Sequence, residues 1–180
     1  MRILSRANPD LPERKHYKVY MIQSLQPETL IQLAQQYETP LYVYHAEKIK
    51  DQYTRLKTAF RDTGAVFFYA CKALTNISIL RYIKDLGANV DCSSINEVKL
   101  ALHAGFPASR ILYTSNGIAF SEIEEAQSLG VIINIDSLSN LDKFGAKYGH
   151  DYPVGIRLRP NILATGNPTI STGHATSKFG

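Results

Sequence analysis

Short apolar runs alternate with longer amphipathic segments from about residue 45 to residue 159. A run such as 131–135 (Val-Ile-Ile-Asn-Ile) is apolar on both faces, which is typical of a strand buried in a parallel sheet. The longer segments carry apolar residues at helical spacing. The pattern therefore predicts a regular alternation of the two element types, with helices over 46–62, 76–86, 94–104, 121–129 and 137–148, and strands over 65–71, 88–92, 110–114, 131–135 and 154–159.

The segment before this alternation has a different character. Its first 24 or so residues are irregular and charged, and predict an extended arm. Pro27 stands at a helix start, and apolar residues at helical spacing follow it. After Thr39-Pro40, the run 41–44 predicts a further strand.

Polar residues at the helix ends support these boundaries. Ser94 with Glu97, and Ser121 with Glu124, match the capping box, in which the first side chain caps the helix and the acidic one reaches back. Glycines that can end helices stand at positions 87, 105 and 130.

Alternating strands and helices with short connections predict an α/β fold with a parallel sheet, either a barrel or an open doubly wound sheet. No Gly-x-Gly-x-x-Gly and no phosphate-binding P-loop follows any strand, which favours the barrel. Residues 160–180 are rich in Thr, Ser, Gly and Asn and predict one long loop. Because compact domains rarely end on such a loop, we expect the fold to continue beyond residue 180.

Composition narrows the class of protein without naming a chemistry. The chain is 44% hydrophobic and 20% charged, as in globular proteins. Its net charge of +4 comes from scattered residues, so we expect anionic small molecules rather than nucleic acid as partners. The sequence has no apolar stretch of signal-peptide or membrane-spanning length, so we expect a cytoplasmic protein that does not bind membranes.

The chain contains two cysteines, Cys71 and Cys92, each at the end of a predicted strand. Without a Cys-x-x-Cys motif or regular histidine spacing, neither a disulfide scaffold nor a structural zinc site is predicted. We expect both to be small buried hydrophobic residues.

Candidate catalytic residues follow from the fold, because parallel α/β proteins build their sites at the carboxyl ends of the strands. Lys72 is the first of them, placed directly after an aromatic strand. An amine at the edge of an apolar core can lose its proton more easily and form a Schiff base with an aldehyde. The other predicted strand ends carry Asp91-Cys92-Ser93, Ser115-Asn116, Asp136-Ser137 and Arg159.

Each of these residues also has an ordinary structural interpretation. A lone lysine at a strand end is more often a solvated terminus than a catalyst. Asp91 and Asp136 precede helices, where carboxylates cap or complement the helix dipole. Arg159 could simply pair with a neighbouring carboxylate. Spacing alone leaves these alternatives open.

Ordered motifs give a further indication. Residues 69–76 (Tyr-Ala-Cys-Lys-Ala-Leu-Thr-Asn) resemble the pyridoxal-phosphate attachment segment of the alanine-racemase-like decarboxylases, and within that family the diaminopimelate decarboxylases. One departure is Asn167-Pro168-Thr169, where the family pattern leads us to expect a histidine. The supporting segments are 39–44, 91–94 with Glu97, 104–107, 157–161, 170–173 and 178–180.

The resemblance implies a (β/α)8 TIM barrel with a separate β domain. Residues 1–44 would then hold an arm, a helix and a strand that belong with the β domain, and residues 45–180 would form the first five βα units of the barrel. It also implies that Lys72 attaches pyridoxal 5'-phosphate and that Asp91 and Arg159 lie beside the cofactor.

The activity implied is that of a carboxy-lyase converting meso-diaminopimelate to L-lysine, in a homodimer. Alternatives are an ornithine, lysine or arginine decarboxylase of the same family, or a non-catalytic pyridoxal-phosphate carrier built on the same barrel. The family's remaining cofactor and substrate residues come from the carboxyl-terminal half and a second subunit. We therefore expect the 180-residue chain to be inactive alone.

Overall fold

The structure is a computed structural model that describes residues 25–162 and residue 173. The chain divides into two compact units, residues 1–65 and 66–180, and each is described by itself. Among the described residues, no helix is long and apolar enough to cross a membrane.

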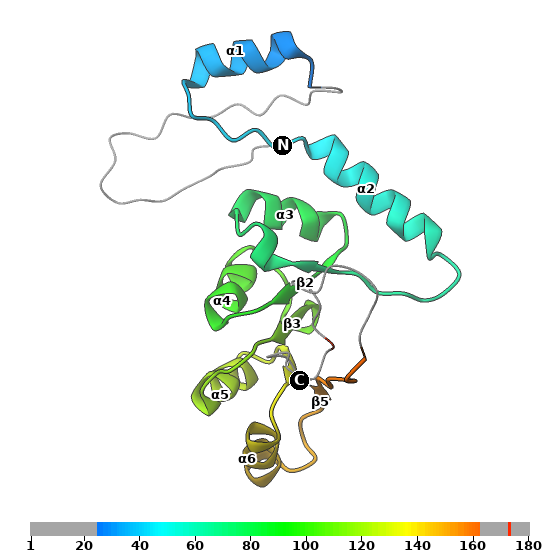
Figure 1. The fold of residues 1–180 in the computed structure, drawn as a ribbon, viewed down its shortest axis with the longest axis vertical. Helices are drawn as coiled ribbons and strands as arrows, with labels where there is room; N and C mark the ends of the chain where they lie inside the picture. The colour runs from blue at the N-terminus through cyan, green and yellow to red at the C-terminus, as the bar shows by residue number, and fades with distance from the viewer. Residues whose placement is uncertain (1–24, 163–172, 174–180) are drawn as a thin grey trace. The chain divides into compact units, whose positions relative to one another are not determined.

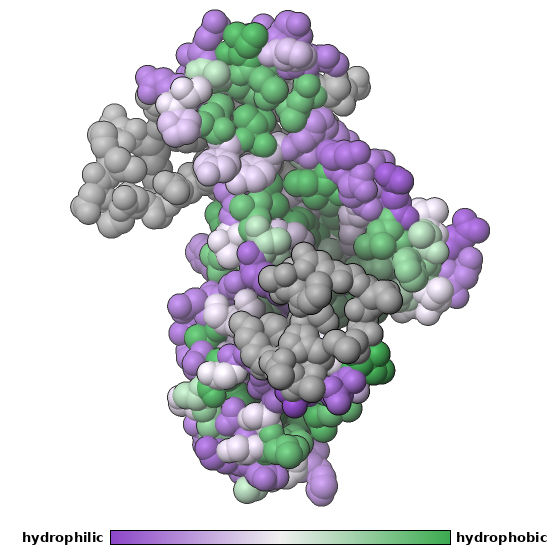
Figure 2. Space-filling model, in the orientation of Figure 1, coloured by the Kyte–Doolittle hydropathy of each residue, from purple (hydrophilic) through white to green (hydrophobic). Residues whose placement is uncertain are grey.

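In the described part of the first unit, residues 25–65, there are two helices, α1 (Pro27–Tyr37) and α2 (Ala46–Ala59). Proline at the first position of α1 confirms the predicted helix start. His45 caps α2, because its Nδ1 accepts a hydrogen bond from the backbone of Lys48 at 3.0 Å. Apolar surface lies over α1 in Figure 2, where Leu30 is 42% and Ile31 57% exposed.

The prediction of a strand over residues 41–44 is wrong. These residues have no regular secondary structure. A strand requires a hydrogen-bonded neighbour, and no described segment pairs with this run. Its apolar composition therefore does not produce a strand in this structure.

The second unit is an α/β layer built on one parallel sheet. Among the residues described in this unit, five strands pair in chain order, β1 to β5, as expected for consecutive units of a barrel (Figure 1). A doubly wound sheet would reverse this order part-way. The strands are β1 (Phe68–Ala70), β2 (Asn89–Cys92), β3 (Ile111–Thr114), β4 (Ile132–Ile135) and β5 (Val154–Ile156), and the helices between them are α3 (Ile77–Asp85), α4 (Ile95–His103), α5 (Phe120–Ser128) and α6 (Leu138–Tyr148).

The hydrophobic core lies between the sheet and these helices. Alternate strand residues point into it, including Val90, Ile111 and Ile133, which are fully buried. The intervening positions are more polar and only half buried, as in the i-B-i-B burial pattern of β2. One face of the sheet is thus a packed core, and the other carries polar side chains.

The predicted elements of this unit agree with the structure except at their ends. The strand predicted over 154–159 ends at Ile156, and that over 65–71 covers only Phe68–Ala70. Ser94 caps α4 as predicted. The second capping box is wrong, because α5 begins at Phe120, after Ala119, and places Ser121 inside its first turn. Most of the predicted tail loop, including 170–172 and 178–180, lies outside the described residues.

Candidate functional site

Lys72 lies at the carboxyl end of β1, but in a short 3₁₀ turn, η1 (Cys71–Ala73), rather than at the end of a longer strand. The hydroxyl of Tyr69 donates to the backbone oxygen of Leu74 at 3.3 Å and so spans this turn. The cap of α3 is Asn76, whose Oδ1 accepts from the backbone of Ser78 at 3.0 Å. The turn and the cap fix the backbone on both sides of Lys72, whose side chain is exposed to solvent.

The exposure of Lys72 differs from the expectation for this residue. The prediction places its amine at the edge of an apolar core, but the described residues leave the side chain in contact with solvent. The reason is the early turn at Cys71, which ends the strand before Lys72. Its location at the strand end is nevertheless the one that the sequence predicts.

Asp91 lies on the neighbouring strand, paired in register with Ala70. Its Oδ1 is buried and has no hydrogen-bond partner. Burial raises the pKa of this carboxyl group, and a hydrogen bond with Thr114 and the positive charges of Lys72 and Arg157 oppose the rise. The structure therefore brings Lys72 and Asp91 into one electrostatic environment.

Asp91 is not a helix cap. The cap of α4 is Ser94, whose Oγ accepts from the backbone of Glu97 at 3.2 Å. The structure therefore does not support the interpretation of Asp91 as a helix cap. An unpaired buried carboxylate oxygen costs free energy, so the environment of Asp91 requires an explanation other than helix capping.

The polar face continues onto the next strands through residues that the sequence analysis did not single out. Asn134 on β4 donates from Nδ2 to Oγ1 of Thr114 on β3 at 3.1 Å. Thr114 in turn bonds Asp91 on β2. These residues were missed because they lie within strands rather than after them. The indication in the sequence was a polar residue at an alternate position of an otherwise apolar run.

The two arginines near β5 differ in position. Arg159 lies three residues past the end of the strand and is exposed. Arg157 is half buried, and its backbone donates to the oxygen of Ile135 at 2.9 Å. It is the charge of Arg157 that acts on Asp91. A role for Arg159 beside the cofactor stays a prediction.

The remaining strand-end residues have structural partners. Asn116 donates from Nδ2 to Oδ2 of Asp136 at 2.7 Å. Ser137 caps α6, accepting from the backbone of Asn140 at 3.2 Å. Ser115 is buried. These contacts favour an ordinary structural role, rather than a catalytic one, for Ser115, Asn116, Asp136 and Ser137.

Both cysteines are fully buried, as predicted. They also contact each other: a side-chain hydrogen bond joins Cys71 and Cys92, lowering the pKa of the first and raising that of the second. Each is the sequence neighbour of a candidate site residue, Lys72 or Asp91.

With this geometry in hand, comparison with known proteins identifies the family. The family described as pyridoxal-dependent decarboxylase, pyridoxal binding domain, matches residues 46–180. The chain belongs to this family. Its domain is accordingly a pyridoxal-binding one, and its parallel sheet of five strands is part of a barrel.

Individual relatives of this decarboxylase-family chain agree. It is 37% identical over 153 residues to a diaminopimelate decarboxylase of Helicobacter pylori, covering 83% of the chain and 38% of that relative. The crystal structure of diaminopimelate decarboxylase from the same organism, complexed with L-lysine, matches with a TM-score of 0.75 and 36% identity over 84% of the chain and 39% of the other. A lysine/ornithine decarboxylase of Vibrio vulnificus, complexed with putrescine, matches with a TM-score of 0.67 and 28% identity. This match covers 78% of the chain and 39% of the Vibrio vulnificus enzyme. The chain thus spans less than two fifths of these relatives.

Proposed function

We propose that this chain provides the cofactor-anchoring lysine of a pyridoxal-phosphate-dependent amino-acid decarboxylase, and that Lys72 is that lysine. The observation that carries the proposal is the location of Lys72 and Asp91 at the carboxyl ends of adjacent strands in a pyridoxal-binding domain, where the charge of Lys72 acts on Asp91. Parallel barrels place their catalytic residues at this end of the sheet.

The residues present fit the cofactor. Lys72 offers a primary amine, the group that binds an aldehyde covalently. Asp91 offers a buried oxygen that lacks a partner. When bound, pyridoxal phosphate acts as an electron sink for the carbanion left by loss of carbon dioxide.

The roles of this chain's own residues follow from their charges. When ionised, Asp91 carries a negative charge that attracts the positive charge of Lys72 at the end of β1. The capped start of α3 keeps the backbone that carries Lys72 in place. Arg159 is included in the proposal as a further cofactor contact, on the strength of the family resemblance alone.

We propose meso-diaminopimelate as the substrate and L-lysine as the product. The support is comparative: identity and TM-score are both higher for the Helicobacter pylori enzyme than for the lysine/ornithine decarboxylase. A homodimer, a cytoplasmic location and a division of the chain near residue 45 belong to the same proposal, because they accompany the family resemblance. The lysine/ornithine class stays the second candidate because it shares the fold.

The proposal is tested in the natural protein in which residues 1–180 occur. Release of carbon dioxide is measured from meso-diaminopimelate, ornithine, lysine and arginine, for the wild type, Lys72→Ala and Lys99→Ala. Lys99 pairs with Glu125 on the helix side and is the matched control. We expect the highest kcat/KM for meso-diaminopimelate, no measurable release with Lys72→Ala, and normal release with Lys99→Ala.

Two different results would contradict two different parts of the proposal. Preference for ornithine would contradict the substrate and leave the role of Lys72 standing. Decarboxylation by Lys72→Ala at the wild-type rate would contradict the role of Lys72 itself.

A further inference from the structure

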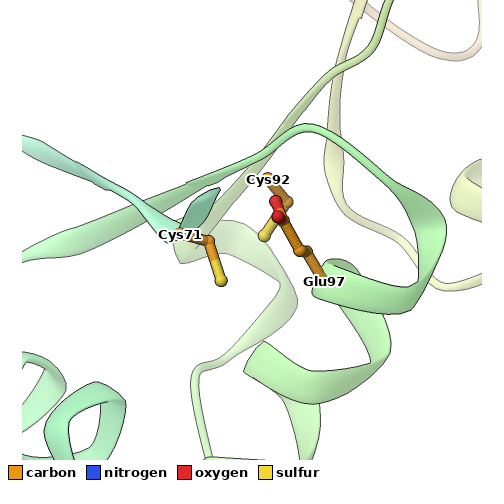
Figure 3. Close-up of side chains that lie close together, drawn as sticks. All are labelled: Cys71, Cys92 and Glu97. Carbon is orange, nitrogen blue, oxygen red and sulfur yellow. The ribbon is translucent and has the colours of Figure 1, made fainter. Parts of the chain in front are cut away.

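Three side chains that can bind metal converge behind the candidate cofactor site. The Sγ atoms of Cys71 and Cys92 and a carboxylate oxygen of Glu97 all lie within 4.8 Å of one another. They come from three elements: η1, the end of β2, and the first turn of α4. Figure 3 shows the three side chains close together.

The sheet register brings the two thiols together. Ala70 pairs with Asp91, so the residues that follow them, Cys71 and Cys92, are neighbours across β1 and β2. Both are 0% exposed. This pair is not evident from the sequence, because the cysteines are not close in the chain and form no Cys-x-x-Cys motif.

Two hydrogen bonds hold the carboxyl group of Glu97 in place. Its Oε2 accepts two hydrogen bonds, from the backbone of Ser93 at 2.7 Å and from the Ser93 hydroxyl at 3.1 Å. Both bonds use Oε2, so Oε1 is available as a ligand. The carboxylate thus directs negative charge at two buried thiols, an arrangement that a cation would stabilise.

We propose that Cys71, Cys92 and Glu97 form a binding site for one Zn²⁺ ion. Two sulfur ligands select a thiophilic ion over Mg²⁺ or Ca²⁺, which prefer all-oxygen sites. Three protein ligands are the set found where zinc keeps a fourth, open position for water. On binding, each thiol releases its proton to solvent, and the two sulfur atoms and the carboxylate oxygen bond the metal.

The consequence of occupancy is local. The ion would link the ends of β1 and β2 to the start of α4, at residues next to Lys72 and Asp91. The site itself does not depend on the proposed function, since its ligands are neither of those two residues.

The test uses the full 180-residue chain, purified with a phosphine reductant and without chelator. Zn²⁺ binding is measured by calorimetry, and Cd²⁺ binding by the ultraviolet thiolate-to-metal charge-transfer absorption. We expect one ion to bind per chain. The thermal unfolding midpoint should rise when Zn²⁺ is added and fall back to its metal-free value when a chelator removes the ion. Cys71→Ser and Cys92→Ser should each lose the charge-transfer signal of the wild-type site.

Glu97→Gln decides the proposal even if the serine variants do not fold. Glutamine still accepts the Ser93 hydrogen bonds but lacks the charged ligand, so Zn²⁺ affinity should fall at least about tenfold. Glu122→Gln is the matched control, because Glu122 occupies the same first-turn position of α5, beside no cysteine, and should bind as the wild type does. The proposal is overturned if the wild type binds no ion, if Glu97→Gln binds with wild-type affinity, or if both glutamine variants weaken binding equally.

Discussion

Among the described residues, two buried side-chain oxygens lack hydrogen-bond partners: Oδ1 of Asp91 and the hydroxyl of Tyr113. They lie on opposite faces of the sheet. Asp91 faces the polar side with Thr114, whereas Tyr113 is fully buried on the helix side. An unpaired buried oxygen costs roughly 1–3 kcal/mol. At Asp91 the proposed function explains that cost, whereas Tyr113 has no such explanation.

Tyr113→Phe should therefore raise the free energy of unfolding by about 1 kcal/mol, because it removes a hydroxyl that makes no compensating bond. Ser115 and Glu122 lie close enough to act on this hydroxyl. It nevertheless has no hydrogen-bond partner of acceptable geometry among the described residues. Tyr152→Phe is the control: the Tyr152 hydroxyl donates to the backbone oxygen of Val131, so its loss should cost about 1 kcal/mol. Urea unfolding at neutral pH measures the free energy of unfolding of both variants. A clear loss of stability in Tyr113→Phe would contradict this account.

The same variant carries a pH dependence. Burial raises the pKa of Tyr113 from 10.0 to about 12. As the pH rises through this range, the unfolded tyrosine ionises while the folded one keeps its proton, so the folded state loses stability. The stability gained by Tyr113→Phe should consequently grow between pH 10 and 12, and a constant difference would show that the hydroxyl is not buried as described.

At the scale of elements, the start of α3 holds the segment that carries Lys72. Asn76 supplies the cap, with Oδ1 accepting from the backbones of Ser78 and Ile79 at 3.0 and 3.2 Å. Asn76→Ala should lower the free energy of unfolding by about 1 kcal/mol. Thr75→Ala, at the exposed neighbouring position, should change it by less than about 0.5 kcal/mol. Equal effects in urea unfolding would contradict the capping role.

The pairing of strands gives a second comparison. A Cβ atom at Gly155 of β5 would overlap Oδ1 of Asn134 on β4, whereas one at Gly145 in α6 would meet nothing. Gly155→Ala should destabilise the fold by roughly 1–3 kcal/mol, because it displaces the amide that bonds Thr114. Gly145→Ala should stabilise it by about 0.5–1 kcal/mol, as alanine favours a helix. Thermal unfolding of the two variants should move in opposite directions, and a shift in the same direction would be contrary to this account.

The sequence was sufficient to predict the order of elements in the second unit because burial imposes periodicity. A strand that packs one face against helices needs apolar residues at alternate positions, as Ile133 and Ile135 show in β4, and that alternation is visible in the sequence. It was insufficient at 41–44, because an apolar run forms a strand only beside a partner. It was also insufficient at Ser121, because α5 is capped at Ala119, two residues before the predicted cap.

At the scale of the whole molecule, the candidate site forms because neighbouring strands bring residues from distant parts of the sequence together. Lys72 and Asp91 were predictable because each lies at a strand end and parallel strands end at one edge. Thr114 and Arg157 were not, since their proximity to Asp91 follows from register and strand length. The cysteine pair likewise arises only from the alignment of β1 with β2.

The central claim is that Lys72 anchors pyridoxal phosphate, and trapping of the cofactor tests it most directly. The natural protein is incubated with pyridoxal phosphate, reduced with borohydride, digested, and analysed by mass spectrometry, alongside its Lys72→Ala and Lys99→Ala variants. We expect the pyridoxyl group predominantly on Lys72 in the wild type and in Lys99→Ala, and only scattered labelling in Lys72→Ala. Labelling spread evenly over the exposed lysines of the wild type, or unchanged in Lys72→Ala, would contradict the account.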